Sequence, residues 1–406
     1  MDGIENASGS PRCRGRFAFL HYRKLAIRPI SVTLSAMTTL LRSFGVAVAA
    51  LLLAPATASA QATQYDGDIM FLTRVIEREY AGFDTKTEGN RRQEYEAQLS
   101  LMNERIAANP EARIHAISAL LDWFADGHLA IQSNIVSPDD PYPDAAPERH
   151  YRIFDLPFAF TFTRLSDHTV MLRVPHFGMD AADELAALLE QHHDTITSTP
   201  NLIIDMRGNS GGSDLTYAPL MAYLYTRPIY SVGAELRVSQ RNLDYLRELG
   251  GDEDMPQEVR NLVANVLASA EQGADYVPLG EDAVSIETYP QVYDFPRRVG
   301  ILAEGAGSSG DQFAIDARFS DKVTFFGGPT AGVIDYSNVI EATSPSGDFT
   351  LRWPMTRSMR LPEEPFDNVG VPADVPFGDD VADHVEAARL WLESRCDCLD
   401  SAVAAH

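Results

Sequence analysis

The sequence predicts an α/β fold in which crossover helices join the strands of a mixed β-sheet. Four short apolar runs typical of buried strands stand at residues 169–174, 201–206, 298–303 and 322–328, which read TVMLRV, NLIIDM, RVGILA and KVTFFGG. Segments of helical length and pattern lie between these runs, so strand and helix alternate along the chain. This alternation favours a parallel or mixed sheet, because each helix carries the chain back across the sheet.

Before this core, the pattern is helical. Apolar residues recur at helical spacing in DIMFLTRVIEREY, residues 68–80, and again across residues 114–124. We therefore expect a small helical N-terminal subdomain over residues 61–135. A Pro/Asp-rich loop at residues 137–150 follows, and alternating phenylalanines at 158, 160 and 162 then predict the first strand of the core.

The α/β core is expected over residues 150–378. Its helices are predicted in DAADELAALLEQHH (180–193), DLTYAPLMAYLY (214–225) and DQFAIDARF (311–319). A largely helical, acidic insertion is expected near residues 236–275. Residues 379–406 are expected to form a C-terminal helix and a tail.

The N-terminal 60 residues are typical of a secretory signal peptide with an upstream extension. A basic start near Met37 precedes a short apolar run, and ASA at residues 58–60 is a small-residue cleavage site. The alternative, a membrane anchor, is disfavoured because the apolar run is too short to span a bilayer. We expect an exported protein, periplasmic or secreted, with no membrane span in its mature part.

Charge and composition exclude several classes of partner and site. Without residues 1–60, 26 basic residues stand against 56 acidic ones, a net charge of −30. Nucleic acid is therefore not an expected partner, since binding phosphates requires a basic surface. Only Cys396 and Cys398 remain, so no disulfide framework is predicted. The run at 192–194, HHD, lacks the spacing and third ligand of a zinc site, and no metal or cofactor is expected.

Two segments offer a serine nucleophile. GNSGG, residues 208–212, satisfies G-x-S-x-G between a predicted strand and a helix, which would make Ser210 the nucleophile of an esterase. Such enzymes need a histidine after the acid, and His384 lies on an apolar helix pattern better explained by packing. The second segment, AEGAGSSGDQFAID at residues 303–316, is either a flexible Gly/Ser turn or a strand-to-helix turn that presents a serine.

Five segments in order resemble the C-terminal-processing (tail-specific) serine peptidase family. They are DWFADGHLAI (122–131), NLIIDMRGNSGG (201–212), RVGILAEGAGSSGDQF (298–313), TFFGGPTAG (324–332) and DNVGVPADVPF (367–377). The histidine in the first of them resembles the branch that includes the tricorn core and the interphotoreceptor retinoid-binding protein modules. Too few residues separate the first segment from the sheet for a PDZ domain, so recognition of a protein's C-terminal tail is not carried over.

The resemblance implies a set of catalytic residues. In the family the nucleophile precedes an acidic residue by three positions, so Asp311 marks Ser308 as the nucleophile. The resemblance implies His128 as general base and Asp367 as the acid that orients it. An amide in Gly211–Gly212 and the amide of Ser309 would stabilise the oxyanion.

Three features of the sequence differ from the patterns of the family. The tail-specific branch uses a lysine, but only Lys86 and Lys322 follow the signal peptide, and neither matches that position. The histidine-using branch has a serine before its histidine where this chain has Gly127. Aspartate also replaces glutamate at both acidic positions, 311 and 367.

The expected function is an exported serine peptidase that cleaves peptides or unfolded polypeptides through an acyl-enzyme. Two alternatives remain open at this stage: a non-catalytic ligand-binding protein on the same fold, and an esterase that uses Ser210. The sequence specifies neither the substrate nor the oligomeric state.

Overall fold

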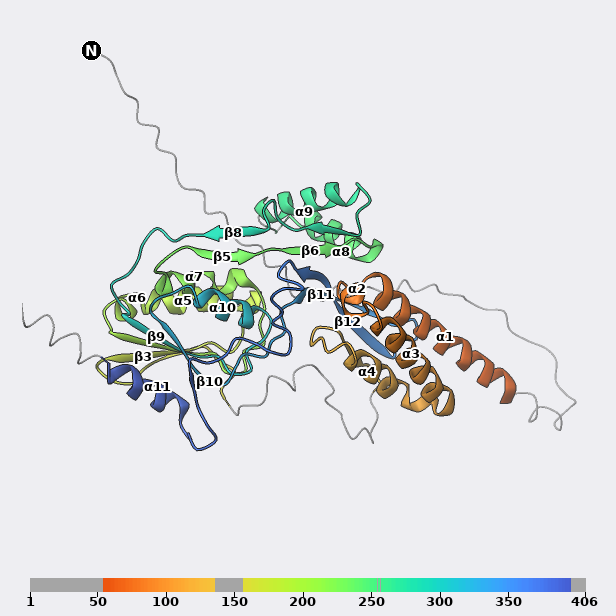
Figure 1. The fold of residues 1–406 in the computed structure, drawn as a ribbon, viewed down its shortest axis with the longest axis horizontal. Coiled ribbons are helices and arrows are strands. Elements are labelled where there is room, and N and C mark those ends of the chain that lie inside the picture. Colours follow the sequence, from red (N-terminus) through yellow and green to blue (C-terminus); the bar gives the residue numbers. More distant parts are fainter. Residues whose placement is uncertain (1–53, 136–155, 254, 256, 396–406) are drawn as a thin grey trace, which may run out of the picture.

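The computed structural model describes residues 54–135, 156–253, 255 and 257–395. Residues 1–53 of the predicted signal peptide, the Pro/Asp-rich loop and both remaining cysteines lie outside the described residues. The described chain has two parts that lie side by side: an α/β core and a lobe of helices on a second sheet (Figure 1).

The core contains a six-stranded sheet in the order β13-β10-β9-β4-β3-β2. Strands β13, β10, β9, β4 and β3 run parallel to one another, whereas β2 is antiparallel to β3. The predicted mixed sheet is therefore confirmed. Its strands are β2 (Thr161–Arg164), β3 (Thr169–Arg173), β4 (Asn201–Asp205), β9 (Arg298–Leu302), β10 (Val323–Gly327) and β13 (Val375–Pro376).

Helices cover both faces of this sheet. All five residues of β4 are buried; its Leu202 and Ile204 pack on one face, whereas Ile203 packs on the other. The first face is covered by α5 (Ala182–Gln191), α6 (His193–Ile196), α7 (Asp214–Leu224) and α10 (Ser309–Ala317), and the second by α11 (His384–Glu393). The short helix η3 (Met179–Ala181) directly precedes α5. Strands buried on both faces read as continuous apolar runs, as the sequence showed.

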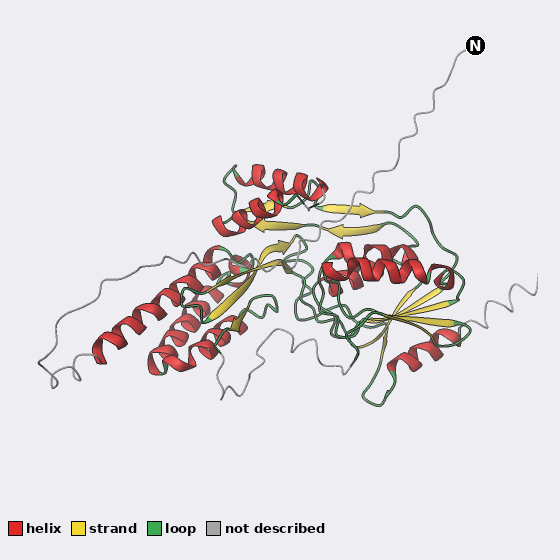
Figure 2. Cartoon of the chain, turned by 180° about the vertical axis from the view of Figure 1, so that it is seen from behind, coloured by secondary structure: helices red, strands yellow, loops and turns green. Residues whose placement is uncertain are grey.

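The second part is built on the antiparallel sheet β1-β12-β6-β7, with β11 paired to β12. Its strands are β1 (Ala130–Ser133), β6 (Ala234–Arg237), β7 (Tyr276–Pro278), β11 (Tyr336–Thr343) and β12 (Phe349–Ser358). Its helices are α1 (Ala54–Arg78), α2 (Phe83–Lys86), α3 (Arg91–Ala108), η1 (Pro110–Ala112), α4 (Arg113–Asp122), α8 (Gln240–Gly251) and α9 (Gln257–Ala270). Seen from behind, these helices flank the second sheet (Figure 2).

The helical segments predicted as an N-terminal subdomain share one hydrophobic core with later parts of the chain. Strand β1 pairs with β12, and residues of α8 and α9 join the same core. Helices α8 and α9 lie within residues 236–275, where the sequence predicts an insertion, and contribute to this core. The division of the chain into domains stays a prediction.

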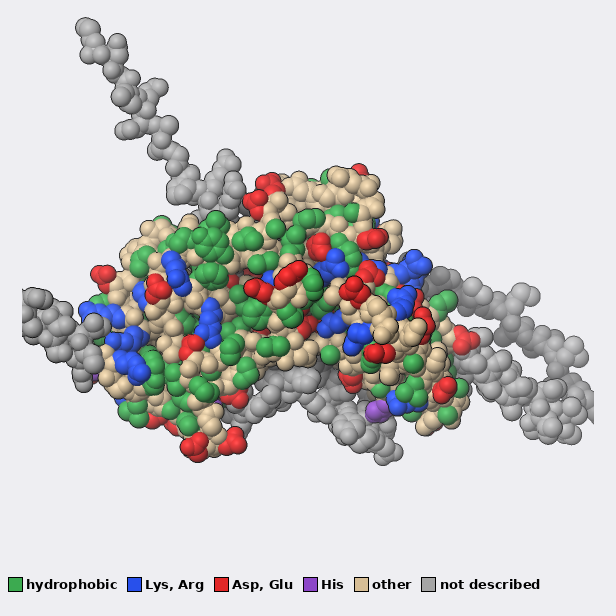
Figure 3. Space-filling view, in the orientation of Figure 1, with side chains coloured by type: hydrophobic (Ala, Val, Ile, Leu, Met, Phe, Trp, Pro, Cys, Tyr) green, Lys and Arg blue, Asp and Glu red, His purple; other side chains and the backbone are tan. Residues whose placement is uncertain are grey.

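A two-stranded ribbon of β5 (Ile229–Val232) and β8 (Val284–Glu287) runs over the α/β core. Within the described residues, none of the helices is both long and apolar enough to cross a membrane. On the face drawn in Figure 3, acidic and basic side chains are interspersed among apolar ones. That face therefore shows no extended patch of only acidic or only basic side chains.

Candidate active site

Ser308 stands at the turn between β9 and α10, where a parallel strand ends and a helix begins. Its backbone has φ 58° and ψ −121°, a region that a residue with a side chain rarely adopts. The Ser308 N–H donates to Asp311 Oδ2 at 3.0 Å and to Val333 O at 3.1 Å, and these bonds hold the strained conformation. A strained strand-to-helix turn is the geometry that presents a nucleophilic serine.

Ser210 lacks this geometry. Four non-glycine residues of the described chain have positive φ, and Ser210 is not among them. Three residues also separate it from the start of α7 at Asp214. The structure thus gives the conformation of a nucleophile elbow to Ser308 and not to Ser210.

The glycine turn after β4 lies directly against Ser308. A Cβ on Gly211 would be 2.6 Å from both Gly307 O and Ser308 Cβ. The Gly211 N–H donates to Asn209 Oδ1 at 2.8 Å, so it is not available to a ligand. The Ser309 hydroxyl donates to Gly212 O at 3.0 Å and ties the turn to the start of α10.

Two amides beside Ser308 have no acceptor. In the described part of the chain, the N–H groups of Gly212 and Ser309 make no backbone or side-chain hydrogen bond. Ser309 is the first residue of α10, where unpaired amides also carry the positive end of the helix dipole. Of the predicted oxyanion donors, Gly212 and Ser309 therefore remain free, whereas Gly211 has a structural partner.

His128 lies in the turn between α4 and β1 and is only 5% exposed. Its Nδ1 is 2.6 Å from Tyr336 O. A carbonyl oxygen only accepts, so Nδ1 carries the hydrogen and the lone pair of the neutral ring is on Nε2. Burial lowers the pKa of His128 to about 4, which keeps the ring neutral above that pH. This is the tautomer and charge that a general base needs.

The group that orients His128 is therefore a backbone carbonyl. The family resemblance implies Asp367 and His128 as partners, but no hydrogen bond joins Asp367 to the His128 ring. Asp367 Oδ1 instead accepts from the N–H groups of Ile334 at 3.0 Å and Asp335 at 2.8 Å. Asp367 and His128 are therefore connected through the backbone of residues 334–336.

Residues 332–336, which we call the junction segment, hold both halves of the site. Asp311 Oδ1 accepts from Gly332 N at 2.9 Å, and its Oδ2 accepts from Val333 N at 2.9 Å. Asp311 is fully buried, and burial raises its pKa to about 6. Two aspartates thus hold four consecutive amides of one segment. The carbonyls of its Val333 and Tyr336 accept from Ser308 and His128.

The junction segment also explains Gly127. A Cβ at Gly127 would lie 3.0 Å from both γ-methyl groups of Val333, closer than ordinary van der Waals contact. Val333 therefore fills the space that a serine side chain would take. A side chain at position 127 would therefore require Val333 to shift.

Ser308 and His128 are separated by Val333 and make no hydrogen bond with each other in this structure. Hydrogen bonds between catalytic groups often tighten only when substrate binds. The structure brings together Ser308, Ser309 and Gly212. It places His128 and Asp367 at the other end of the junction segment, His128 at the carbonyl of Tyr336 and Asp367 at the amides of Ile334 and Asp335.

A group of buried charges surrounds Asp367. Its Oδ2 makes no hydrogen bond, and Lys86 Nζ lies 3.7 Å from it. Burial, reinforced by the nearby carboxylate of Asp126, raises the pKa of Asp367 to about 7. Asp126 accepts from His128 N at 2.9 Å and from the Tyr80 hydroxyl at 2.7 Å, and burial raises its pKa too.

Several of these residues were missed from the sequence. Asp126 could have been recognised, because an aspartate side chain commonly accepts a hydrogen bond from the backbone N–H two residues later and so forms a local turn. Tyr336 gave no such indication, since it acts through its carbonyl oxygen. The sequence offers Lys86 only as a possible general base, and its position does not match the lysine of the family. Among the described residues, no group of three or more His, Cys, Asp or Glu side chains is placed to hold a metal ion.

Residues 168–377 of the chain match the sequence model of peptidase family S41. Among the curated proteins, none matches the chain significantly. Similar solved structures include a candidate peptidase from Parabacteroides merdae, with 16% identity, a TM-score of 0.50, and coverage of 82% of this chain and 98% of that one. This likeness supports the fold alone.

Two further structures are less similar. The photosystem II D1 C-terminal processing protease has 12% identity and a TM-score of 0.38, with 80% of this chain and 96% of that chain covered. Mature CPAF, complexed with lactacystin, has 19% identity and a TM-score of 0.42. That match covers 58% of this chain and 53% of the CPAF chain, so it spans about half of CPAF.

Proposed function

We propose that this chain, which belongs to peptidase family S41 and is a serine-type peptidase, is exported and cleaves peptide bonds through an acyl-enzyme on Ser308. The observation that supports Ser308 as the nucleophile is its strained turn beside two unpaired amides, whereas the proposed export rests on the signal-peptide pattern of the N-terminal 60 residues. Peptides or unfolded polypeptides are the proposed substrates, because a peptidase acts on their backbone.

In the proposed first step, Ser308 Oγ attacks the carbonyl carbon of the scissile bond while His128 Nε2 takes the hydroxyl proton. The negative charge moves to the carbonyl oxygen, where the amides of Gly212 and Ser309 donate to it. Collapse of this intermediate breaks the C–N bond, and His128 gives its proton to the leaving amine. Water, deprotonated by His128, then releases the acid and restores Ser308.

In this proposal, Asp367 and Asp311 position the base and the nucleophile through the junction segment. Neither carboxylate touches the reacting atoms. The shorter aspartate suits this task, since both side chains reach backbone amides directly at 2.8–3.0 Å.

The experiment uses the purified chain without residues 1–60, a fluorescent fluorophosphonate and an unstructured protein substrate. We expect the wild type to be labelled and to cleave the substrate, and Ser308→Ala to do neither. Ser210→Ala serves as the matched control and should retain both activities. A wild type that is neither labelled nor active would favour a ligand-binding protein, and loss of labelling in Ser210→Ala would favour the esterase.

A further inference from the structure

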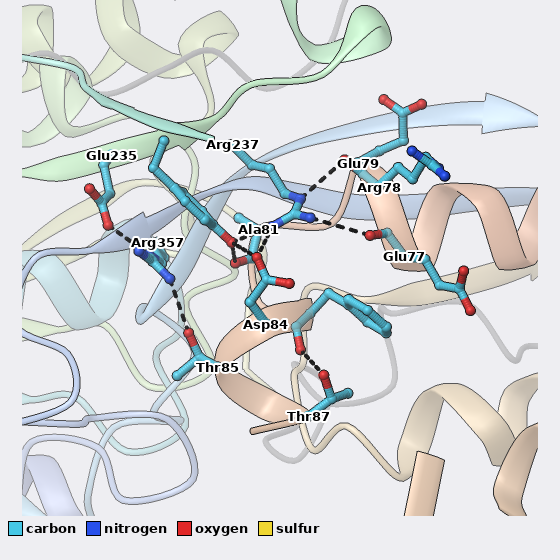
Figure 4. Close-up of polar contacts among 12 residues, drawn as sticks. Glu77, Arg78, Glu79, Ala81, Asp84, Thr85, Thr87, Glu235, Arg237 and Arg357 are labelled. Atoms are coloured by element: carbon cyan, nitrogen blue, oxygen red, sulfur yellow. Dashed lines mark hydrogen bonds and ion pairs between the residues drawn. The ribbon is translucent and has the colours of Figure 1, made fainter. Parts of the chain in front are cut away.

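Lys86 is one of two lysines after the predicted signal peptide, and its position is fixed by the second sheet. It ends the short helix α2, whose neighbours are held by a polar cluster (Figure 4). In this cluster Arg237 pairs with Asp84, and Arg357 donates to Thr85 Oγ1 at 3.3 Å. The backbone that carries Lys86 is thus held firmly against strands β6 and β12.

The rest of the cluster holds the residues on either side. The Tyr276 hydroxyl donates to Ala81 O at 2.9 Å, and the Thr87 hydroxyl donates to Phe83 O at 2.7 Å. Arg237 also donates to the carbonyl of Arg78 at 3.1 Å, at the end of α1. These bonds use the polar groups around Lys86 and leave its own ammonium for other partners.

The ammonium of Lys86 contacts three elements that hold His128. Nζ donates to Ala125 O at 3.2 Å, three residues before His128. It lies 3.7 Å from Asp367 Oδ2, the carboxylate oxygen that makes no hydrogen bond, and 5.0 Å from the centre of the Tyr336 ring. The Lys86 side chain is 17% exposed and that of Asp367 7% exposed, so the pair is largely shielded from water.

The same carbonyl has a second donor from the Asp367 loop. Asn368 Nδ2 donates to Ala125 O at 2.9 Å, and Ala125 has a positive φ of 49°. Lys86 and Asn368 therefore hold a strained residue at the start of the turn that carries His128. Because Nζ is a donor in its contact with the carbonyl and faces a carboxylate, the geometry gives Lys86 the role of a donor and not of a base.

We propose that Lys86 is a positioning residue of the active site, whose ammonium ties the turn of His128 to the loop of Asp367 and so fixes the His128 ring. This inference rests on the proposed function, since it concerns the same base. Without the ammonium, Asp367 Oδ2 has no partner and the turn at Ala125 loses one of its two donors. The ring of His128 then moves relative to Ser308, and small displacements of catalytic groups have large effects on rate.

A pH profile separates this role from simple stabilisation. Lys86 lowers the pKa of Asp367, so removing its charge shifts protonation of Asp367 to higher pH. The titratable and charged groups that act electrostatically with Asp367 are Asp126, Asp335, Lys86, Tyr80, Tyr336 and Arg360. The carboxylate of Asp126 raises the pKa of Asp367, so the position of the midpoint also depends on the charge of Asp126.

The experiment measures the rate constant of fluorophosphonate labelling against pH for Lys86→Met, Lys86→Gln and Lys86→Arg. We expect Lys86→Met and Lys86→Gln to be slower by about tenfold or more at pH 7.5, with the acid limb moved to higher pH. Lys86→Arg keeps the charge and should recover most of the rate. Lys322→Met is the matched control, because Lys322 Nζ donates to Tyr293 O at 2.6 Å and serves no site residue; it should match the wild type.

The proposal is overturned if Lys86→Gln is labelled within twofold of the wild type with an unshifted profile. It is also overturned if Lys86→Arg is as slow as Lys86→Gln. Lys86→Gln retains a donor for Ala125 O, so it remains informative if Lys86→Met does not fold. Failure of the proposed function would look different: the wild type itself would not be labelled at Ser308.

Discussion

Gly211→Ala tests the contact between the glycine turn and the nucleophile. Gly211 has a φ of +78°, and the added Cβ would be 2.6 Å from Gly307 O and from Ser308 Cβ. The turn cannot simply move away, because the Gly211 carbonyl accepts from Phe177 N at 2.7 Å and its N–H donates to Asn209. The left-handed backbone costs about 1–2 kcal/mol and overpacking about 1–3 kcal/mol. We expect a loss of about 2–5 kcal/mol in the free energy of unfolding.

Activity should fall further than stability suggests. Displacing the adjacent Gly212 amide from Ser308 removes one oxyanion donor, an effect of about 10²–10³-fold on rate. The matched control is Gly273→Ala, since Gly273 has a φ of +83° but no atom within 4 Å of the added Cβ. Urea unfolding and fluorophosphonate labelling are measured for both. The reasoning is refuted if Gly211→Ala unfolds like Gly273→Ala and is labelled at the wild-type rate.

Two further predictions concern the base and the buried carboxylates. His128→Gln should slow labelling by about 10²–10⁴-fold with little change in the urea midpoint, because a glutamine amide can still donate to Tyr336 O; His115→Gln, at an exposed position of α4, should change neither. Burial raises the folded-state pKa of Asp311 to about 6 and of Asp367 to about 7, so each of these carboxyls binds more protons in the folded than in the unfolded chain above about pH 4. His128 acts in the opposite direction between about pH 4 and 6.5, because burial lowers its pKa to about 4. The contribution of Asp367 to the free energy of unfolding should therefore fall as the pH rises from about 4 to 7, by up to about 4 kcal/mol. It is measured as the difference in urea unfolding between the wild type and Asp367→Asn at each pH; a difference that stays constant or rises with pH would contradict this.

The strands and helices of the α/β core were predictable because their signals are local. The runs around β4 and β9 are apolar on both faces, which is typical of a buried parallel strand. The serine turn was predictable for the same reason: β9, a short turn and α10 follow one another directly in the chain.

The second sheet was not predicted, because it depends on pairing between distant segments. Strand β1 pairs with β12 in the register Ala130↔Arg352, and no local pattern indicates such a partner. The sequence therefore suggested a separate helical subdomain, whereas the helices pack on strands from the second half of the chain.

Prediction of the site from the sequence was limited in a similar way. The serine and the histidine were identified from segments that resemble a family, but the acceptor of His128 is a backbone oxygen. The side chain of Tyr336 gives no indication of that role. Asp367 was assigned to the histidine because its sequence position matches an acid, yet its hydrogen bonds go to backbone amides. The identity of a side chain thus did not indicate which atoms it contacts in the site.

The most direct test of the central claim is to map the fluorophosphonate adduct by tandem mass spectrometry of the digested wild-type protein. The account predicts a single adduct on Ser308, in the peptide that contains AEGAGSSGDQFAID. An adduct on Ser309 or Ser210, with Ser308 unmodified, would contradict it.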